Sequence, residues 1–197
     1  MDTLDQGKNL INIARDAILA RFSGKKPKIN SNLKNEFSEP RGAFVTLKIN
    51  GNLRGCIGFT ETIYPLYDVI VNAAQAAGFS DPRFPPLSKD EFQNVTIEVS
   101  VLTRPEVIEV RNPEDYLNKI TIGKDGLFIK STFHSGLLLP QVAVEYGWDA
   151  RTFLSQVCIK AGLKQGDWQD YNECRIYTFQ SYVFSEKTPN GEVIQIM

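Results

Sequence analysis

Apolar side chains recur every three or four residues in several stretches of the chain, which is the spacing of a helix that buries one face. The first stretch predicts a helix over residues 3–22. Thr3 stands three residues before a glutamine, the spacing of a capping box, which supports a start there. Pro65 suits the first turn of a second helix, because its missing N–H needs no partner there, and Gly78 suits the end of that helix. Further helices are expected shortly after Pro113, over 140–147, and over 150–161 between Asp149 and Gly162.

Strict alternation of apolar and polar residues predicts the strands. Residues 43–49 and 53–57 flank Asn50-Gly51, a dipeptide typical of a two-residue hairpin turn. Over 95–101 every second residue is Val or Ile, so this strand is expected to bury one face. The remaining expected elements are a hairpin with its turn at 123–126 and a strand near 175–184, followed by a weakly ordered tail.

These elements together indicate the class of fold. Strands that are joined by hairpins and interleaved with helices favour an α+β fold, with a mixed or mainly antiparallel sheet and flanking helices. A chain of 197 residues has the length of a single domain, or of one domain with a smaller lobe. Residues 1–197 are therefore expected to form one domain.

Charge and composition limit which kinds of partner and which cellular compartment are expected. The formal net charge is −1, and the basic cluster at 25–28 has the length of a solvated linker, so nucleic acid is not an expected partner. No apolar run reaches the roughly 18–20 residues that span a bilayer, and the N-terminal residues lack the pattern of a signal peptide. The 3 cysteines are widely spaced, which favours reduced thiols in a cytoplasmic protein.

Metal and cofactor sites lack support in the sequence. Cys158 and Cys174 lie far apart with few ligands nearby, and Cys158 stands among apolar helix positions typical of a core. His134 is the only histidine, which excludes a two-histidine metal site. The chain has no P-loop, no dinucleotide-binding glycine motif and no serine-hydrolase elbow, so no cofactor is indicated.

The segment Leu53-Arg54-Gly55-Cys56-Ile57-Gly58 combines a cation, a thiol and two glycines. In a strand, Arg54 and Cys56 share one face, and a guanidinium beside a thiol favours the reactive thiolate. Gly55 and Gly58 leave room for another backbone or a ligand. The plainer interpretation is a packed cysteine, a glycine bulge and an arginine paired with a carboxylate. Spacing alone favours the plainer interpretation, because free cysteine is among the most buried residue types.

Three other positions are candidates, each with a structural alternative. Asp81 and Arg83 lie in a proline-stiffened loop that could present a fixed charge pair to a substrate, or could be a crossover whose arginine satisfies backbone carbonyls. Glu98 could act as a general base or pair with Arg54, while an exposed sheet face is the simpler interpretation. His134 could serve as a base for the thiol, or be an exposed loop residue.

Several motifs, in order along the chain, resemble those of the AMMECR domain family. They are Arg41-Gly42-Ala43-Phe44-Val45-Thr46-Leu47, the six residues 53–58, Asp81-Pro82-Arg83-Phe84-Pro85-Pro86-Leu87, and the blocks at 97–102, 136–143, 148–149 and 158–163. The matches extend from about residue 10 to residue 185 and show no departure at the central six residues.

This resemblance implies a fold and the place of a site, but no reaction. It implies a larger lobe and a smaller lobe with a cleft between them, and places the six-residue signature near that cleft. Proteins similar to this one are generally intracellular. In prokaryotes the domain is often encoded beside, or fused to, Memo-type and radical-SAM proteins, which makes these proteins candidate partners.

With the resemblance added, a binding site at Cys56 becomes the favoured interpretation over a packed core cysteine. Core packing seldom needs an arginine, a cysteine and a glutamine specifically, whereas a polar cleft does. The candidate binding residues are Arg54, Gly55, Cys56, Gly58, Asp81, Arg83 and Gln141, and the catalytic candidates are Cys56, Glu98 and His134. In one hypothesis the cleft binds a small molecule, in an enzyme or in a subunit of a multicomponent redox system. In the other, the protein is a non-catalytic adaptor that binds a peptide, metabolite or protein.

Overall fold

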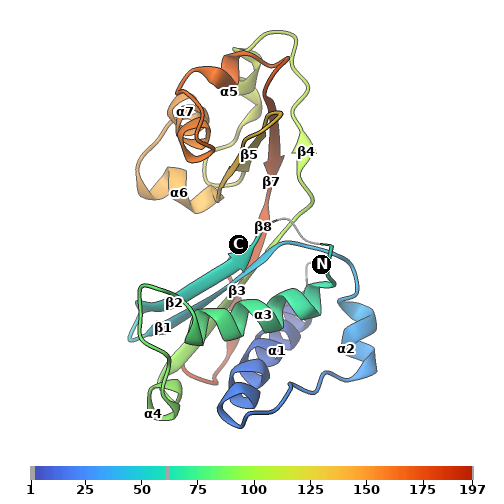
Figure 1. Ribbon diagram of the computed structural model, residues 1–197, viewed down its shortest axis with the longest axis vertical. Helices are drawn as coiled ribbons and strands as arrows, with labels where there is room; N and C mark the ends of the chain where they lie inside the picture. The colour runs from blue at the N-terminus through green and yellow to red at the C-terminus, as the bar shows by residue number, and fades with distance from the viewer. Residues whose placement is uncertain (1–2, 61–62, 197) are drawn as a thin grey trace. The chain divides into compact units, whose positions relative to one another are not determined.

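The computed structural model describes residues 3–60 and 63–196 (Figure 1). The chain forms two compact units. Unit 1 comprises Met1–Leu102 and Tyr182–Met197, and unit 2 comprises Thr103–Ser181. Each unit contains helices and its own antiparallel sheet, which confirms the predicted α+β class. The expectation of a cleft between two lobes stays a prediction.

Unit 1 is built on a five-stranded sheet in the order β2-β1-β3-β8-β9. Strand β1 is antiparallel to both β2 and β3, and β8 is antiparallel to β9. The strands are β1 (Ala43–Ile49), β2 (Asn52–Phe59), β3 (Val95–Leu102), β8 (Ser181–Glu186) and β9 (Val193–Gln195). The helices are α1 (Leu4–Phe22), α2 (Ser31–Glu36), α3 (Leu66–Phe79) and α4 (Lys89–Phe92).

The core of unit 1 lies between this sheet and two helices. On β1 and β3, Val45, Leu47, Ile97 and Val99 are completely buried, in one cluster with the apolar faces of α1 and α3. Both helices cross the same face of the sheet (Figure 1). Alternation along a strand then turns the intervening residues toward the other face, which carries the polar side chains.

The β1–β2 hairpin forms where the sequence predicts it. Asn50 and Gly51 have φ values of 51° and 78°, the left-handed conformation that a two-residue type I′ turn requires at both positions. The register then shifts, because Leu47 pairs with Gly55 whereas Lys48 pairs with Leu53. Arg54 is the extra residue of this bulge.

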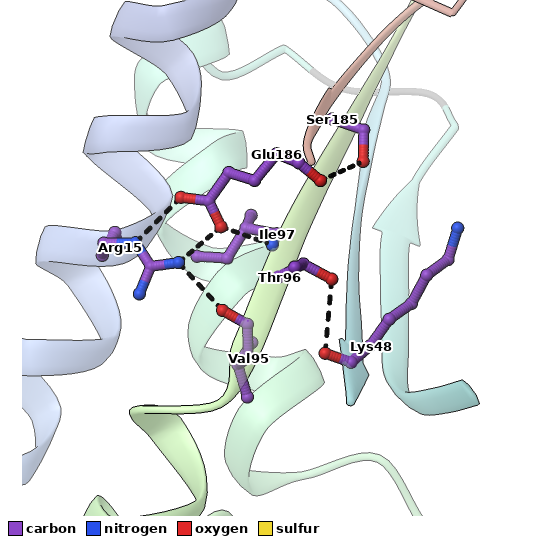
Figure 2. A network of polar contacts seen from close by, with 7 residues as sticks. All are labelled: Arg15, Lys48, Val95, Thr96, Ile97, Ser185 and Glu186. Carbon is purple, nitrogen blue, oxygen red and sulfur yellow. Dashed lines mark hydrogen bonds and ion pairs between the residues drawn. The ribbon is translucent and has the colours of Figure 1, made fainter. Parts of the chain in front are cut away.

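An ion pair connects α1 to the sheet (Figure 2). Arg15 donates through Nε and Nη2 to both carboxylate oxygens of Glu186, and through Nη2 to the carbonyl of Val95. Glu186 Oε2 also accepts the backbone N–H of Ile97 at 2.9 Å. Because both side chains are largely buried, one carboxylate joins α1, β3 and β8 in a place with little access to solvent.

Unit 2 contains a four-stranded sheet in the order β4-β7-β5-β6. Its strands are β4 (Glu106–Val107), β5 (Gly126–Lys130), β6 (Ser135–Leu138) and β7 (Arg175–Phe179). Its helices are α5 (Asp115–Lys119), α6 (Pro140–Glu145), α7 (Ala150–Lys160) and the 3₁₀ turn η1 (Asp167–Gln169). Cys158 lies in its core beside Phe153 and Trp168, as predicted.

The predicted helices are found with small shifts at their ends. Thr3 caps α1 and Asp149 caps α7, each accepting a backbone N–H of the first turn. Pro65 is the N-cap of α3 and not its first helical residue, and α3 continues one residue past Gly78.

Three expectations for the second half of the chain are wrong. The turn around 123–126 leads from α5 into β5, and the hairpin is instead β5–β6, which turns at residues 131–134. The strand expected at 175–184 is broken at Gln180, so that β7 and β8 belong to different sheets. The tail expected to be weakly ordered contains β9, which pairs with β8 and completes the sheet of unit 1.

Candidate functional site

Cys56 lies on the face of the unit 1 sheet opposite α1 and α3. Thr46 on β1 is the cross-strand partner of Cys56 on β2 and of Glu98 on β3, so these three side chains share that face. Thr46 Oγ1 donates to Cys56 Sγ at 3.2 Å, and Lys48 Nζ lies 2.8 Å from Glu98 Oε2. Thr46, Lys48, Cys56 and Glu98 are called the Cys56 face below.

A buried carboxylate fixes the backbone of Cys56. β2 is an edge strand, so its outward N–H has no neighbouring strand to bond. Asp81 Oδ2 accepts the N–H of Cys56 at 2.9 Å, and Arg83 Nη2 donates to the carbonyl of Cys56 at 3.0 Å. The Asp81–Arg83 loop therefore satisfies both backbone groups of Cys56, the structural role that the sequence left open for this arginine.

Asp81 is held ionised by its neighbours. Its oxygens accept from Arg83 Nε at 2.9 Å, from Arg83 Nη2 at 2.7 Å and from the backbone N–H of Arg83 at 3.1 Å. These bonds, the Arg83 side chain first, keep the pKa of Asp81 well below its usual range even though burial opposes this. About half of the Arg83 side chain stays exposed, so its guanidinium is accessible to a ligand.

The cation that contacts Cys56 is Arg83, through the hydrogen bond from its Nη2 to the carbonyl of Cys56. The pKa of Arg83 is raised first by its hydrogen bond to Asp81 and also by the charge of that carboxylate, although burial opposes this. Arg54, which the sequence placed beside the thiol, instead binds the carboxylate of Glu91 through Nε at 2.9 Å and Nη2 at 3.2 Å. Sequence reasoning thus identified a guanidinium near the cysteine, but the bulge in β2 directs Arg54 elsewhere.

Arg54 connects β2 to the loop and helix that follow α3. Besides Glu91, it donates to the carbonyl of Pro85 at 3.0 Å and lies over the ring of Phe84 at 5.7 Å. The Arg54 hydrogen bond lowers the pKa of Glu91 to about 2, helped by the capping contacts of Ser88. Nη1 of Arg54 is buried and has no hydrogen-bond partner among the described residues. Most contacts of Arg54 are therefore those of a structural ion pair.

The two glycines of the signature allow close packing of protein on protein. A Cβ at Gly55 would lie 2.1 Å from the carbonyl oxygen of Ala77, so its hydrogen lets α3 approach the sheet. A Cβ at Gly58 would lie 2.2 Å from the ring of Phe44, which is its cross-strand partner on β1. The space that the sequence predicts around the thiol is thus filled by a helix backbone and an aromatic ring.

Gly55→Ala is expected to lower the free energy of unfolding by about 1–3 kcal/mol, because a backbone oxygen cannot move away as a flexible side chain does. Gly166→Ala is the matched control, since a Cβ there meets nothing within 4 Å and φ is negative. Urea unfolding followed by circular dichroism measures both. Equal stability of the two variants would contradict the close approach of α3.

Two of the candidates predicted from the sequence lie in unit 2. His134 is exposed in the β5–β6 turn, where its backbone exchanges hydrogen bonds with Ser131. Gln141 lies in the first turn of α6, and its Oε1 is buried without a partner among the described residues. A role for either residue beside Cys56 stays a prediction.

The structure adds Thr46, Lys48 and Glu91 to the residues singled out from the sequence. Thr46 and Lys48 alternate with buried positions of β1, a pattern that places them on the polar face without indicating which partners they meet. Glu91 stands three residues after Ser88, the spacing of the capping box it forms. That signal predicts a helix start, but not the ion pair with Arg54.

The thiols differ in their surroundings. Cys158 and Cys174 are buried, and burial raises the pKa of both thiols, that of Cys158 to about 11. Cys56 is half-buried, and all three are free.

Within residues 3–60 and 63–196, no group of three or more His, Cys, Asp or Glu side chains is placed to hold a metal ion. Over the same residues, no helix is long and apolar enough to cross a membrane.

The fold and this site define a class of α+β proteins in which a free cysteine lies on the polar face of an antiparallel sheet, beside an Asp–Arg pair at the sheet edge. The chain belongs to the AMMECR1 family, whose model matches residues 11–184. The resemblance stated from the motifs is thereby confirmed.

Several relatives are similar over nearly their whole length. A protein of Methanothermobacter thermautotrophicus is 47% identical over 183 residues, which cover 92% of this chain and 95% of that protein. Protein MJ0810 of Methanocaldococcus jannaschii is 46% identical, with 98% and 96% covered. The crystal structure of the uncharacterized protein PH0010 from Pyrococcus horikoshii superposes with a TM-score of 0.85, at 42% identity, over 97% of this chain and 96% of that one. These names state no activity.

Proposed function

We propose that the Cys56 face binds a small molecule that carries an anionic group. In this proposal the thiol of Cys56 is the group of the protein that reacts with the bound molecule. The observation that carries the proposal is the hydrogen bond from Thr46 to Cys56 Sγ, in a cysteine whose carbonyl accepts from the half-exposed guanidinium of Arg83. A hydroxyl donor and a cation both stabilise negative charge on sulfur, the form in which a thiol acts as a nucleophile.

The other residues of the site support this role. Arg83 is fixed by Asp81 yet half exposed, as a residue that holds a ligand's phosphate or carboxylate group needs to be. Lys48 and Glu98 form an ion pair on the same face and can donate to or accept from the rest of the ligand. Cys158 and Cys174 are buried and therefore serve poorly as reactive thiols. The thiol and the charged side chains around it would be used in an enzyme, and equally in a redox subunit that acts with partner proteins.

Alkylation of the native protein with iodoacetamide tests the thiol. One cysteine is expected to react quickly, and Cys56→Ser should remove that reaction. Arg83→Gln should slow it by about three- to tenfold at neutral pH, because a positive charge close to a thiol favours its reaction as a nucleophile and this variant removes that charge. The measurement is the rate of mass increase by mass spectrometry, with peptide mapping to assign the site.

Arg41→Gln is the matched control, because it also removes a guanidinium paired with a carboxylate, that of Glu39, in unit 1. Its alkylation rate should equal that of the unchanged protein. The proposal fails if Cys56 does not react before the protein unfolds, or if the two arginine variants react equally fast. A binding module that uses no thiol chemistry would then be the better hypothesis.

A further inference from the structure

A second site in unit 1 lies apart from the residues of the Cys56 face. A cavity of about 750 Å³ is formed by the C-terminal end of α1, the loop at 24–29, α2 and α3. This volume lies within the range of pockets that hold small molecules and cofactors, roughly 300–1,000 Å³. None of the residues of the Cys56 face lines it, so it is separate from the site described above.

Four cations line this cavity. Arg21 comes from the end of α1, Lys25 and Lys26 from the loop, and Lys34 from α2, while the carboxylate in the lining is Asp68 of α3. Within the described part of the chain, none of the four cations forms an ion pair. Arg21 and Lys34 lie over aromatic rings, at 6.0 Å from Phe79 and 5.9 Å from Tyr67.

This concentration of charge is local, because the whole chain has a formal net charge of −1. Interpreted from the sequence alone, residues 25–28 had the character of a solvated linker. The fold adds Arg21 and Lys34 to Lys25 and Lys26 around one hollow, so that four cations and the carboxylate of Asp68 share its lining. Such a concave positive surface raises the local concentration of anions and favours phosphate groups, which lysine and arginine bind strongly.

The rest of the lining is suited to an uncharged, partly apolar group of a ligand. Ile29 and Val71 supply apolar surface, and Asn72 and Gln75 supply side-chain amides on α3. Gln75 Nε2 already donates to the carbonyl of Ala17 at 3.1 Å, which orients the amide and leaves its oxygen to accept. Apolar surface with a few placed amides is what binds a flat heterocycle such as a nucleobase.

We infer that this cavity is a binding site for a nucleoside polyphosphate. The lysines and Arg21 bind the phosphates, and the base packs on the apolar side with its polar edge toward the α3 amides. Asp68 can accept a hydrogen bond from a ribose hydroxyl or a base amino group. The inference does not depend on any reaction at Cys56.

Isothermal titration calorimetry of the full chain with ATP at low ionic strength tests the site. Binding to one site is expected, with Kd on the order of 10–100 µM. Adenosine alone and inorganic triphosphate alone should each bind at least about tenfold more weakly, since each occupies only part of the cavity. Raising the salt concentration should weaken ATP binding, because the attraction is between exposed charges.

Matched variants distinguish binding of ATP in the cavity from binding to charged residues elsewhere on the surface. The double variant Lys25→Glu/Lys26→Glu should weaken ATP binding at least about tenfold. Lys28→Glu changes a neighbouring exposed lysine that is not part of the lining, and should change Kd less than about twofold. Val71→Trp fills the apolar side without changing any charge, and should also weaken binding. Circular dichroism checks that each variant is folded.

The inference is overturned if ATP shows no binding at millimolar concentration, or if Lys28→Glu weakens binding as much as the double variant. Binding of inorganic triphosphate as tight as that of ATP would exclude the nucleoside part. Alkylation of Cys56 in the Lys25→Glu/Lys26→Glu variant should stay at the rate of the unchanged protein, so the two sites can fail separately.

Discussion

Glu186→Ala is expected to lower the free energy of unfolding by about 3–5 kcal/mol, because it leaves Arg15 as an unpaired charge in a largely buried place. The same carboxylate accepts the N–H of Ile97, so that donor also loses its partner. The change thus affects α1, β3 and β8 together (Figure 2). Urea unfolding followed by circular dichroism gives the free energy of each variant.

Glu192→Ala is the matched control, because it removes a glutamate whose ion pair with Lys187 is exposed. Exposed pairs contribute about 0–1 kcal/mol, so the control should be nearly as stable as the unchanged protein. If the two variants lost equal stability, the connection of α1 to the sheet through Arg15 and Glu186 would be of little energetic importance. A double variant that replaces Arg15 and Glu186 by Met and Leu should recover part of the loss, since it removes both charges.

Asp81→Ala is the other change with a large expected effect, a loss of about 2–4 kcal/mol. The carboxylate is buried and accepts from the backbone N–H of Cys56 and from the Arg83 side chain, and both donors lose their partner. Hydrogen exchange should show the loss locally, because the N–H of Cys56 on the edge strand would be protected less. Asp81→Asn should lose less than Asp81→Ala, since an amide oxygen can still accept that N–H.

The sign of the pH dependence follows from the pKa of Asp81. The folded protein holds this pKa below its usual range, so the stabilisation is fully present above about pH 4, where Asp81 is ionised even in the unfolded chain. It is lost progressively as the pH falls further, toward the lower pKa of the folded state. The stability difference between the unchanged protein and Asp81→Asn should therefore shrink below about pH 4. A constant difference from pH 7 to pH 2 would show that the charge of Asp81 is not responsible.

Features that depend on neighbouring residues could be predicted from the sequence. The turn at Asn50-Gly51 and the caps at Thr3 and Asp149 each depend on residues within one or two turns, and all three were found as expected. Cys158 was placed in a core because its helical spacing shows its apolar neighbours. In the candidate site, the sequence singled out the thiol, the glycines and the charged loop that contacts Cys56, but not Thr46, whose hydroxyl donates to the thiol.

What could not be predicted depends on pairing between distant segments. A regular two-residue hairpin would pair Thr46 with Gly55, and only the bulge at Arg54 shifts its partner to Cys56. No local pattern reveals that shift, so the sequence could not show that Arg54 pairs with Glu91 while Arg83 contacts Cys56. The break at Gln180 has the same origin, because a strand that is continuous in sequence pattern pairs with two different sheets.

The insertion of unit 2 between β3 and β8 has a consequence for the order in which the protein is made. The ribosome releases residues 103–180 before it releases β8, so the nascent chain holds β1, β2 and β3 while one edge of β3 still lacks its neighbour. Unpaired strand edges are the places where incomplete chains associate wrongly. Unit 2 has its own sheet and core and can finish folding during this interval, whereas the sheet of unit 1 is completed later, when β8 and β9 join it.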